Sequence, residues 1–535
     1  MWTRAIASLA ELSTRGNRRD AIVVEPSDDS IHALPHKQGQ AVLGVGSRLA
    51  SGPAESLVKT AFARELADQM ALFRGMSLAD IAHTVMLIKE EIIPGAHGGA
   101  LLSALLELHA VPADFTPQPE SGDLYTNREA WLAAHTSAVG WLGAGRARRE
   151  STTTGYRITV RSLLLTFADL LMQTGDALIE RASEYRASLM ADYTYLQPAQ
   201  PTTFGHYLLG FVYPLLRDLD RLHGLYVRTN LSPAGCGSVN GSRIPQDRRL
   251  LAELLGFDGL VHHARDAMWQ ADGPIEALST IVMALVNLDR LAEDLQIFAT
   301  AEFGLVELAD GHTRASVIMP QKKNPYALNY VRGATNELMG TLASVTALGR
   351  TPSGQVDNRV FAYGDVPRAL ELASGVATLM ADVVRGLRFN ASLAAARLAS
   401  GYATATDLAE TITLEAGLDF RTAHRIVGRL VREATEANRS MDDLTIEDLD
   451  ALAQVMIQRP LRLSDAAFAR ALDPATAVAT RQGIGGAAPE PLAAMFAECR
   501  TALAAHAGWR KEAAGRITAA EDGLLSRAHM LAGDV

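Results

Sequence analysis

The sequence has little cysteine and no long uninterrupted apolar segment. Among its 535 residues only Cys236 and Cys499 are cysteines, which excludes a disulfide framework and a zinc site built on cysteine pairs. No run of about 18 consecutive apolar residues occurs, so we expect no membrane span. These absences favour a protein of a reducing compartment, and we expect a cytoplasmic one.

Concentrated positive charge is also missing. The chain has 50 lysines and arginines against 60 acidic residues, a net charge of −10, and the basic residues are scattered. This balance gives no electrostatic reason to bind nucleic acid or a membrane surface. We therefore expect the partner to be a small-molecule substrate.

Strand patterns are scarce, and helical patterns take their place. Residues 55–110, 156–190 and 204–226 are long and apolar, and Pro214 is expected to bend the last of these. In 278–295 the apolar or small residues are spaced alternately by three and four, at Leu278, Ile281, Leu285, Leu288, Ala292 and Leu295. The pattern predicts an all-α fold with a long-helix bundle, whose surplus apolar surface favours oligomers.

One short segment, ASVIMPQKKNP at residues 315–325, fits neither a helix nor a strand because of its prolines. Lys322 and Lys323 supply positive charge and Asn324 supplies amide donors. Ser316 can act as a base or nucleophile only if its proton is removed or its alkoxide is stabilised. Taken alone, such a segment is more often a solvated turn; the alternative is an anion site that contains a reactive hydroxyl.

This segment resembles the signature loop GSSxMPxKxNP of the fumarase/aspartase superfamily, in the QKKNP form typical of argininosuccinate lyases. The resemblance extends over roughly residues 47–490. Further stretches that match family motifs in the same order are GAGRARRESTTTGYR (143–157), DYTYLQPAQPTTFGHYLL (192–209), SPAGCGSVNGSRIPQDRRLLAELLGFDG (232–259) and the C-terminal segment 405–431.

The resemblance implies an all-helical fold of three domains, whose central bundle assembles into a homotetramer with active sites shared between subunits. We expect an N-terminal domain over 1–147 with an irregular arm at 1–45, the bundle over 148–392, and a small helical domain over 393–535. The stretch from about residue 500 is expected to be a peripheral helix or a tail. The implied reaction is a reversible anti β-elimination that releases fumarate from a succinyl-amine, without a metal or an organic cofactor.

The resemblance also assigns roles to individual residues. Ser316 aligns with the general base, and Lys322 and Asn324 align with groups that bind a substrate carboxylate. Thr194 and Arg148 match further substrate-binding positions. Removing a proton next to a carboxylate builds a second negative charge there, which is costly unless donors and cations are already in place.

The sequence departs from the family pattern at the half of the site that serves the leaving group. Tyr195 replaces the histidine of THLQ, and Asn329 replaces the glutamate that orients that histidine. We take Tyr195 as the candidate acid; the alternative is that it is inert and packs against the substrate. Gln197, in the same motif, is a candidate substrate-binding residue. Arg149 adds a cation where an asparagine is expected. The segment 353–366 lacks the residues that hold the arginine moiety.

Three interpretations follow. The first is an argininosuccinate lyase, an enzyme of arginine biosynthesis. The second is a related carbon–nitrogen lyase with a different leaving group. The third is a non-catalytic structural or regulatory relative, which the lost histidine and glutamate favour and the intact loop disfavours. A metal site at His32 and His36 is not expected, because Pro35 between them interrupts a helix.

Overall fold

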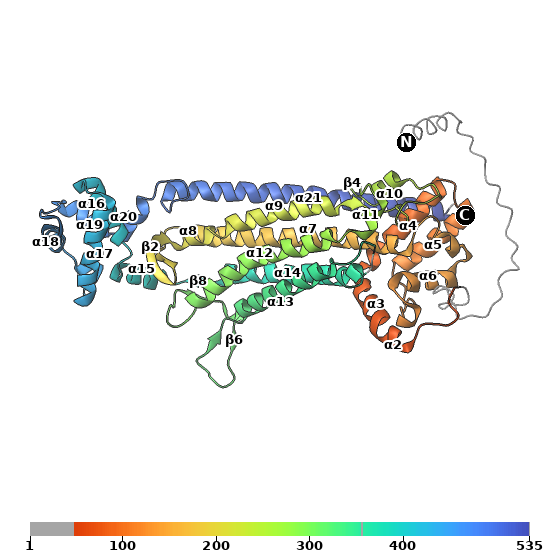
Figure 1. Cartoon of the computed structure of the whole chain (residues 1–535), viewed down its shortest axis with the longest axis horizontal. Helices are drawn as coiled ribbons and strands as arrows, with labels where there is room; N and C mark the ends of the chain where they lie inside the picture. The colour runs from red at the N-terminus through yellow and green to blue at the C-terminus, as the bar shows by residue number, and fades with distance from the viewer. Residues whose placement is uncertain (1–47, 355–356, 534–535) are drawn as a thin grey trace, which may run out of the picture.

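The structure is a computed structural model that describes residues 48–354 and 357–533. A helical unit at one end, a bundle of long helices and a second small helical unit at the other end follow one another along the molecule (Figure 1). The first unit contains α2 (Glu55–Leu57), α3 (Ala63–Gln69), α4 (Phe73–Lys89), α5 (Gly95–His109) and α6 (Leu124–His135).

Five long helices form the bundle. They are α7 (Arg148–Glu184), α9 (Val212–Thr229), α12 (Asp272–Phe298), α13 (Tyr326–Leu348) and α14 (Asp357–Gly386), and shorter helices lie between them: α8 (Phe204–Leu209), α10 (Arg248–Leu254) and α11 (Ala264–Trp269). Helix α7 packs on α14, α9 and α4, and α12 packs on α13 and α14. The predicted all-α class is confirmed.

The predicted apolar seam of α12 faces the core. All six of its residues are at most 4% exposed: Leu278, Ile281, Leu285, Leu288, Ala292 and Leu295. The bend expected at Pro214 lies slightly earlier in the chain, between the end of α8 and the start of α9. Pro214 stands in the first turn of α9, where a missing N–H removes no helical hydrogen bond.

Two glycines allow α4 and α7 to cross at backbone contact. A Cβ atom on Gly75 would lie 2.5 Å from the carbonyl oxygen of Gly155, so no side chain fits at Gly75 without a shift of the backbone. This close crossing fixes the N-terminal unit against the beginning of α7.

The C-terminal part of the chain divides in two. Helices α15 (Ala391–Ser400), α16 (Ala405–Ala416), α17 (Phe420–Glu436), α18 (Ile446–Ile457), α19 (Asp465–Leu472) and α20 (Pro474–Ala479) form the small end unit. Most of this unit has a hydrophobic core of its own, from Leu408 to Ala471. Thr445 and Asp448 form a capping box at the start of α18.

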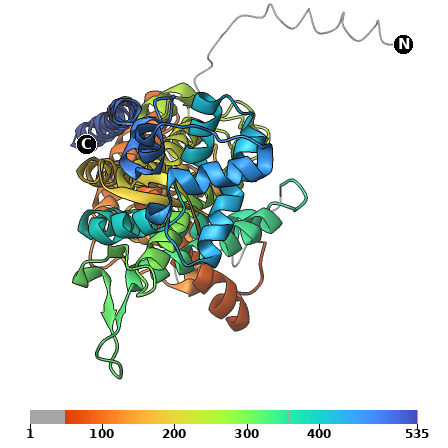
Figure 2. The same cartoon turned by 90° about the vertical axis from the view of Figure 1, so that its left-hand side faces the viewer.

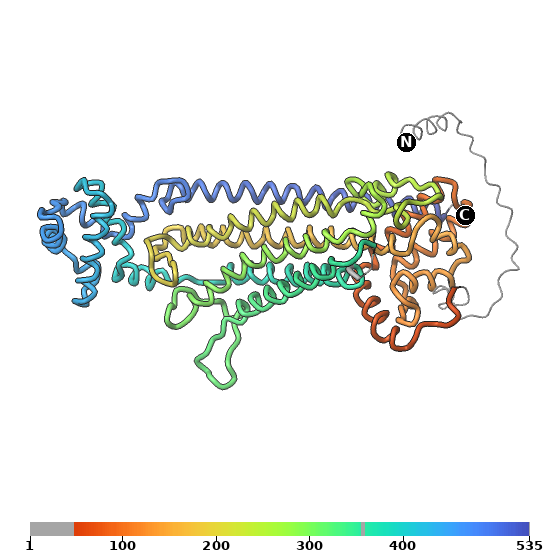
Figure 3. The backbone as a smooth tube through the Cα atoms, viewed as in Figure 1, coloured from red at the N-terminus to blue at the C-terminus, as the bar shows by residue number. Residues whose placement is uncertain are grey.

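Helix α21 (Pro489–Gly533) differs from the peripheral helix or tail that we expected. It runs back along the whole bundle and packs on α7, α9 and α5 (Figure 3). Leu492, Phe496, Leu503 and Leu524 are buried in the same core as the bundle. The buried face of α21 could not be recognised from the sequence, because its alanine-rich composition gives a weak hydrophobic periodicity.

The described strands are short and pair only two at a time. The pairs are β1 (Leu189–Thr194) with β2 (Gln197–Thr203), β3 (Leu231–Ser232) with β4 (Gly259–Leu260), β5 (Val306–Glu307) with β8 (Arg388–Phe389), and β6 (Arg314–Ala315) with β7 (Lys323–Asn324). Only β3 and β4 are parallel. Two of these pairs, β1–β2 and β6–β7, are hairpins that carry predicted site residues.

Two helical stretches are long and apolar enough to cross a membrane by length and composition alone, Glu55–Lys89 and Arg148–Glu184. In them 83% and 61% of the apolar window is buried inside the protein. Core helices of a bundle show the same combination, so these stretches are weak evidence for a membrane span.

Candidate active site

The first group of predicted site residues lies at the start of α7. Arg148 Nε is 3.4 Å from Asp123 Oδ2, and Arg149 Nη1 donates to Glu65 Oε1 at 2.6 Å. Asp123 caps α6 by accepting from the Thr126 N–H, so its position is fixed by the helix it begins. Both arginines are therefore held by carboxylates of neighbouring elements.

A cavity of about 430 Å³ opens beside these arginines. Its lining comprises Leu49, Ser51, Gly52, Pro53, Leu57, Phe62, Glu65, Gly122, Asp123, Arg148 and Arg149. The side chain of Arg148 is 44% exposed, whereas that of Arg149 is 20% exposed. A substrate carboxylate can reach Arg148 more readily, because that guanidinium is only partly engaged by Asp123.

A buried ionic cluster anchors the chain just before Arg148. Asp80 of α4 is fully buried and accepts hydrogen bonds from Arg128, Arg146 and Ser151. Burial alone would raise the pKa of Asp80, but the charges of Arg146 and Arg128 hold it below its usual value. Arg146 and Ser151 flank Arg148 and Arg149 in sequence. The cluster therefore fixes the backbone from which the side chains of Arg148 and Arg149 extend.

Glu150 ties the start of α7 to the loop after β3. Its two carboxylate oxygens accept the backbone N–H groups of Gly235 at 2.8 Å and Gly237 at 2.6 Å. Both glycines have positive φ angles, 72° and 74°, which glycine adopts without strain. Burial raises the pKa of Glu150 to about 7, although the Arg146 charge and the two N–H groups oppose that rise.

The Glu150 carboxyl is expected to make stability depend on pH. Its ordinary pKa is 4.5 and its pKa in the folded chain is about 7, so between these values the folded protein keeps a proton that the unfolded chain has lost. The free energy of unfolding should therefore fall as pH rises through this window, by about 3 kcal/mol in total. Denaturant unfolding of the native protein and of Glu150→Gln at several pH values measures this change in the free energy of unfolding. If the free energy of unfolding depended on pH equally in both proteins, the prediction would be wrong.

The second group lies on the β1–β2 hairpin. Thr194 pairs with Gln197, and the two-residue turn between them contains Tyr195 and Leu196, with φ angles of 53° and 57°. Large side chains seldom adopt positive φ, so this turn is strained. The Tyr195 side chain is 98% exposed, and Leu196 is 53% exposed. The Tyr195 ring therefore lies exposed at the tip of the hairpin, where another molecule or subunit can contact it.

The third group lies on the β6–β7 hairpin, which projects away from the bundle (Figure 2). The Asn324 amide donates to the Arg314 carbonyl at 2.7 Å and closes the base of the hairpin. Lys323 Nζ is 3.0 Å from Glu307 Oε1 and 2.7 Å from Asp310 Oδ1. Lys323 therefore fastens the hairpin to the preceding segment.

The loop of this hairpin carries Ser316, whose hydroxyl is the predicted base. The Met319 N–H donates to Ser316 Oγ at 3.0 Å, and the Lys322 N–H donates back to the Met319 carbonyl at 3.0 Å. A backbone donor aimed at a hydroxyl oxygen stabilises the negative charge of its alkoxide. Val317 and Ile318 at the tip are 107% and 84% exposed, an unusual state for aliphatic side chains.

The three groups are not brought together within one chain. Arg148 begins α7 and the β1–β2 hairpin follows its other end, so about 54 Å of helix separates Arg148 from Tyr195. The β6–β7 hairpin leaves the bundle where α13 begins, away from the N-terminal unit (Figure 1). Any site that contains Arg148, Tyr195 and Ser316 must be completed by other copies of the chain.

Several residues that shape these groups could not be recognised from sequence patterns. Glu65 and Asp123 hold the two arginines, and Glu150 holds the glycine loop, yet none of them belongs to a spacing that predicts the contact. Asp123 alone had a local signal, since an aspartate directly before a helix is a common cap. Tyr195 and Asn329, which replace the paired histidine and glutamate of the family, are both exposed in the chain.

The arm with His32 and His36 lies outside the described residues. Within residues 48–354 and 357–533, no three side chains of histidine, cysteine, aspartate or glutamate are grouped closely enough to hold a metal ion.

Comparison with known proteins identifies the class. Residues 124–340 match a family model described as "Lyase", and residues 402–479 match the model "Argininosuccinate lyase C-terminal". The chain is similar to the argininosuccinate lyase of Methanothrix thermoacetophila, with 36% identity over 426 residues that cover 78% of this chain and 85% of the relative. The corresponding enzyme of Methanoculleus marisnigri has 34% identity over 461 residues, which cover 85% and 92%.

Solved structures agree with this class. A crystal structure of EDDS lyase in complex with formate superposes with a TM-score of 0.82 and 28% identity, covering 90% of this chain and 97% of that one. An EDDS lyase variant with bound fumarate gives the same TM-score at 27% identity. Fold, motifs and relatives together define a fumarate-forming carbon–nitrogen lyase. The chain belongs to the argininosuccinate lyase family of the fumarase/aspartase superfamily.

Proposed function

We propose that this lyase removes an amine from an N-succinyl substrate with Ser316 as the general base, in sites that neighbouring subunits of a homotetramer complete. The hydrogen bond from the Met319 N–H to Ser316 Oγ is the observation that carries the assignment of the base. In the forward direction the Ser316 alkoxide takes the proton from the carbon next to a carboxylate. The charge passes to that carboxylate, the C–N bond breaks, and fumarate and the amine leave.

Positive groups and donors are expected to meet this charge. Lys322 and Asn324 lie on the same hairpin as Ser316, and Thr194 lies on the other exposed hairpin. Arg148 supplies a half-exposed guanidinium at the 430 Å³ cavity. Preorganised donors of this kind stabilise a developing carboxylate dianion because they need no rearrangement during the reaction.

The exposed surfaces support assembly. On α13 the side chains of Tyr326, Tyr330 and Met339 are between 44% and 51% exposed. On the same helix a Cβ atom at Gly333 or Gly340 would meet nothing within 4 Å, so both positions are open to a second helix. An apolar and small-residue helix face of this kind is typical of a surface that packs on another copy. Light scattering that finds a monomer would contradict the tetramer.

Two leaving groups remain to be distinguished, the arginine of argininosuccinate and another amine. A panel of N-succinyl compounds that includes argininosuccinate tests this, with fumarate release followed by ultraviolet absorbance. We expect release from at least one compound and addition of the matching amine to fumarate in reverse. The absence of turnover in both directions on every compound would contradict the proposed function.

Tyr195 is the proposed acid, because its hydroxyl stands where the family has a histidine. Tyr195→Phe keeps the ring and is expected to lower kcat about 100-fold with a strongly basic leaving amine, since that amine must be protonated as it departs. A substrate that departs as a stable anion should be affected less than threefold. Tyr193→Phe, on strand β1 next to the turn, is the matched control. Equal loss with both kinds of leaving group would show that Tyr195 only packs against the substrate.

A further inference from the structure

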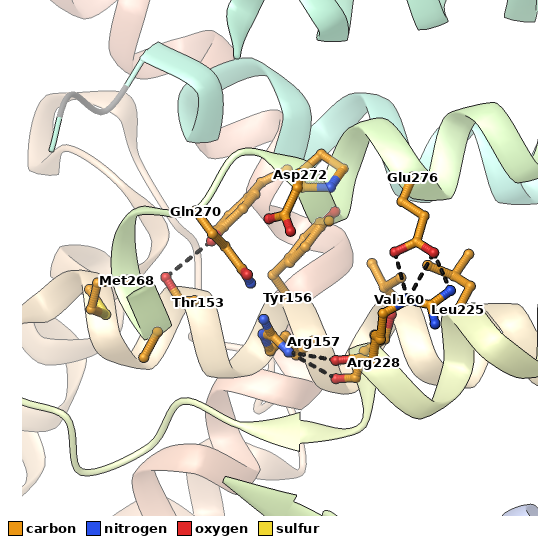
Figure 4. A pocket seen from close by; sticks show the side chains of 15 residues that line it. Thr153, Tyr156, Arg157, Val160, Leu225, Arg228, Met268, Gln270, Asp272 and Glu276 are labelled. Atoms are coloured by element: carbon orange, nitrogen blue, oxygen red, sulfur yellow. Dashed lines mark hydrogen bonds and ion pairs between the residues drawn. The ribbon is translucent and has the colours of Figure 1, made fainter. Parts of the chain in front are cut away.

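Two cavities away from the candidate site differ in whether their cations already have partners. The smaller, of about 70 Å³, lies between α7, α9 and α12 (Figure 4). In it Arg228 Nε donates to both carboxylate oxygens of Glu276, at 2.9 and 3.0 Å. Arg157 Nη1 donates to the backbone carbonyls of Arg228 and Thr229, at 3.2 Å each. The arginines of this cavity are therefore engaged within the chain.

The larger cavity, of about 400 Å³, lies where the bundle meets the small end unit. Three segments that are far apart in sequence form it: the base of the β1–β2 hairpin, helix α20, and the beginning of α21 with the residues just before it. These elements gather at one end of the bundle (Figure 1). The lining comprises Arg186, Ala187, Leu189, Thr203, Ala475, Val478, Ala479, Ala487, Pro489, Leu492, Ala493 and Phe496.

The wall of this larger cavity is almost entirely apolar. Its large side chains Val478, Leu492 and Phe496 are each at most 6% exposed. The Thr203 hydroxyl is already engaged, because it accepts the His206 N–H at 3.0 Å as the cap of α8. Protein cores seldom contain voids larger than a water molecule, whereas apolar spaces of several hundred Å³ are typical of small-molecule sites. The size and lining of the cavity therefore indicate a ligand site.

Arg186 gives this apolar space one positive charge. Its Nη1 donates to the Ser183 carbonyl at 3.2 Å, and the carboxylate closest to it in sequence, Glu184, pairs with Arg181 at 2.6 Å. Within residues 48–354 and 357–533, no aspartate or glutamate lines the cavity or forms an ion pair with Arg186. A Cβ atom on Gly205 would lie 2.6 Å from the Arg186 Cα, so α8 holds the Arg186 backbone by close contact.

An apolar wall with one cation that lacks a carboxylate is complementary to a molecule that has an apolar body and one anionic group. We propose that this cavity binds an aliphatic monocarboxylate, with the chain between α20 and α21 and the carboxylate at Arg186. If each non-hydrogen atom takes the volume of a water molecule in the liquid, about 30 Å³, the space accommodates about 13 such atoms. A saturated carboxylic acid of about ten carbons has this size.

The position of the cavity separates this ligand from the lyase substrate. Leu189 and Thr203 are paired at the base of the β1–β2 hairpin, and both line the cavity. Thr194 and Tyr195, which are proposed to meet the substrate, lie at the opposite end of the same hairpin. A carboxylate bound at the base therefore occupies a place of its own, and its binding does not depend on the proposed reaction.

Titration calorimetry of the native full-length protein with decanoate tests the site. We expect one decanoate per chain with a Kd of about 100 µM or lower. Decyltrimethylammonium has the same chain with the opposite charge and should bind at least about tenfold more weakly. Acetate, which lacks the chain, should give no measurable binding. The absence of saturable decanoate binding up to about 1 mM would contradict the proposal.

Substitutions in the wall locate the ligand. Ala493→Trp on α21 and Ala479→Trp on α20 place a large ring in the space from two sides, and both positions are exposed enough to accept it. Each should weaken decanoate binding at least about tenfold. Ala497→Trp, one turn further along α21 and outside the lining, is the matched control and should stay within about twofold of the native protein. Native affinity in both filling variants would place decanoate elsewhere and overturn the inference.

The role of Arg186 has its own measurement. Arg186→Gln should weaken decanoate binding about fourfold, as expected for a partly exposed charge pair, and should leave decyltrimethylammonium no weaker than before. Equal losses for both probes, or none for decanoate, would remove the carboxylate from the proposed contact.

A second copy of the chain is the other possible occupant of this apolar space. In that case decanoate would not bind, and Ala493→Trp would weaken assembly as measured by light scattering, a result that refutes the carboxylate site. A protein that releases fumarate from an N-succinyl compound but binds no decanoate would likewise refute this site while leaving the proposed function intact.

Discussion

Replacing Ser316 with alanine is expected to lower kcat for fumarate formation by about 10³-fold, because general bases contribute on that order to proton transfer. The loss should be similar for every N-succinyl substrate, since proton abstraction is common to all of them. KM should change little, because the hydroxyl acts on the reacting proton and the carboxylates are bound elsewhere. Initial rates of fumarate release with purified variants measure the effect.

The matched control is Thr313→Val, a hydroxyl close to Ser316 that donates only to the Asp310 carbonyl. This variant should keep more than about half of the native rate, as is usual for a surface substitution that touches no reacting group. Light scattering and thermal unfolding should show that Ser316→Ala assembles and unfolds like the native protein. A Ser316→Ala variant with native rates would remove the assigned base from the mechanism.

The second large effect concerns stability. Asp80→Asn is expected to lower the free energy of unfolding by about 3–5 kcal/mol, because it leaves the buried Arg128 and Arg146 without an anion. Activity should fall as well, since Arg146 and Ser151 no longer hold the start of α7 in place. Denaturant unfolding measured by circular dichroism gives the difference.

Asp382→Asn is the control for this change. Asp382 forms an ion pair with Arg385 on α14, but the two side chains are 54% and 43% exposed. An exposed pair contributes less than about 1 kcal/mol, so this variant should resemble the native protein. If Asp80→Asn and Asp382→Asn cost the same, the buried cluster would not be the anchor described above.

The helical bundle could be predicted because its signal is local. In α12 the buried leucines repeat at helical spacing. A narrow apolar stripe of this kind is buried when that face of the helix packs against the core. The same logic failed for α21, because its buried residues, such as Leu503, Ala513 and Leu524, are widely spaced among exposed alanines. The helices on which α21 packs lie hundreds of residues earlier in the chain. No local sequence pattern indicates which of them a long helix contacts.

The candidate site was predictable only where it resembles a motif. Ser316, Lys322 and Asn324 stand in one short string, so their common location on the β6–β7 hairpin required no long-range information. The pairing of Arg149 with Glu65 and that of Arg128 with Asp80 depend on how distant helices meet. Charge pairs of this kind follow from packing rather than from spacing, which is why the sequence indicated the cations but not their partners.

The central claim is that groups from separate ends of the bundle form one site after assembly. Mixing Ser316→Ala with Arg148→Met, each inactive alone, through reversible dissociation and reassembly tests it most directly. If each site takes these two residues from different subunits, about a quarter of the sites in an equal mixture contain both native residues, and activity should return to about that fraction. Two tags of different size on the variants show whether mixed oligomers form. If mixed oligomers form but recover no activity, the account is contradicted.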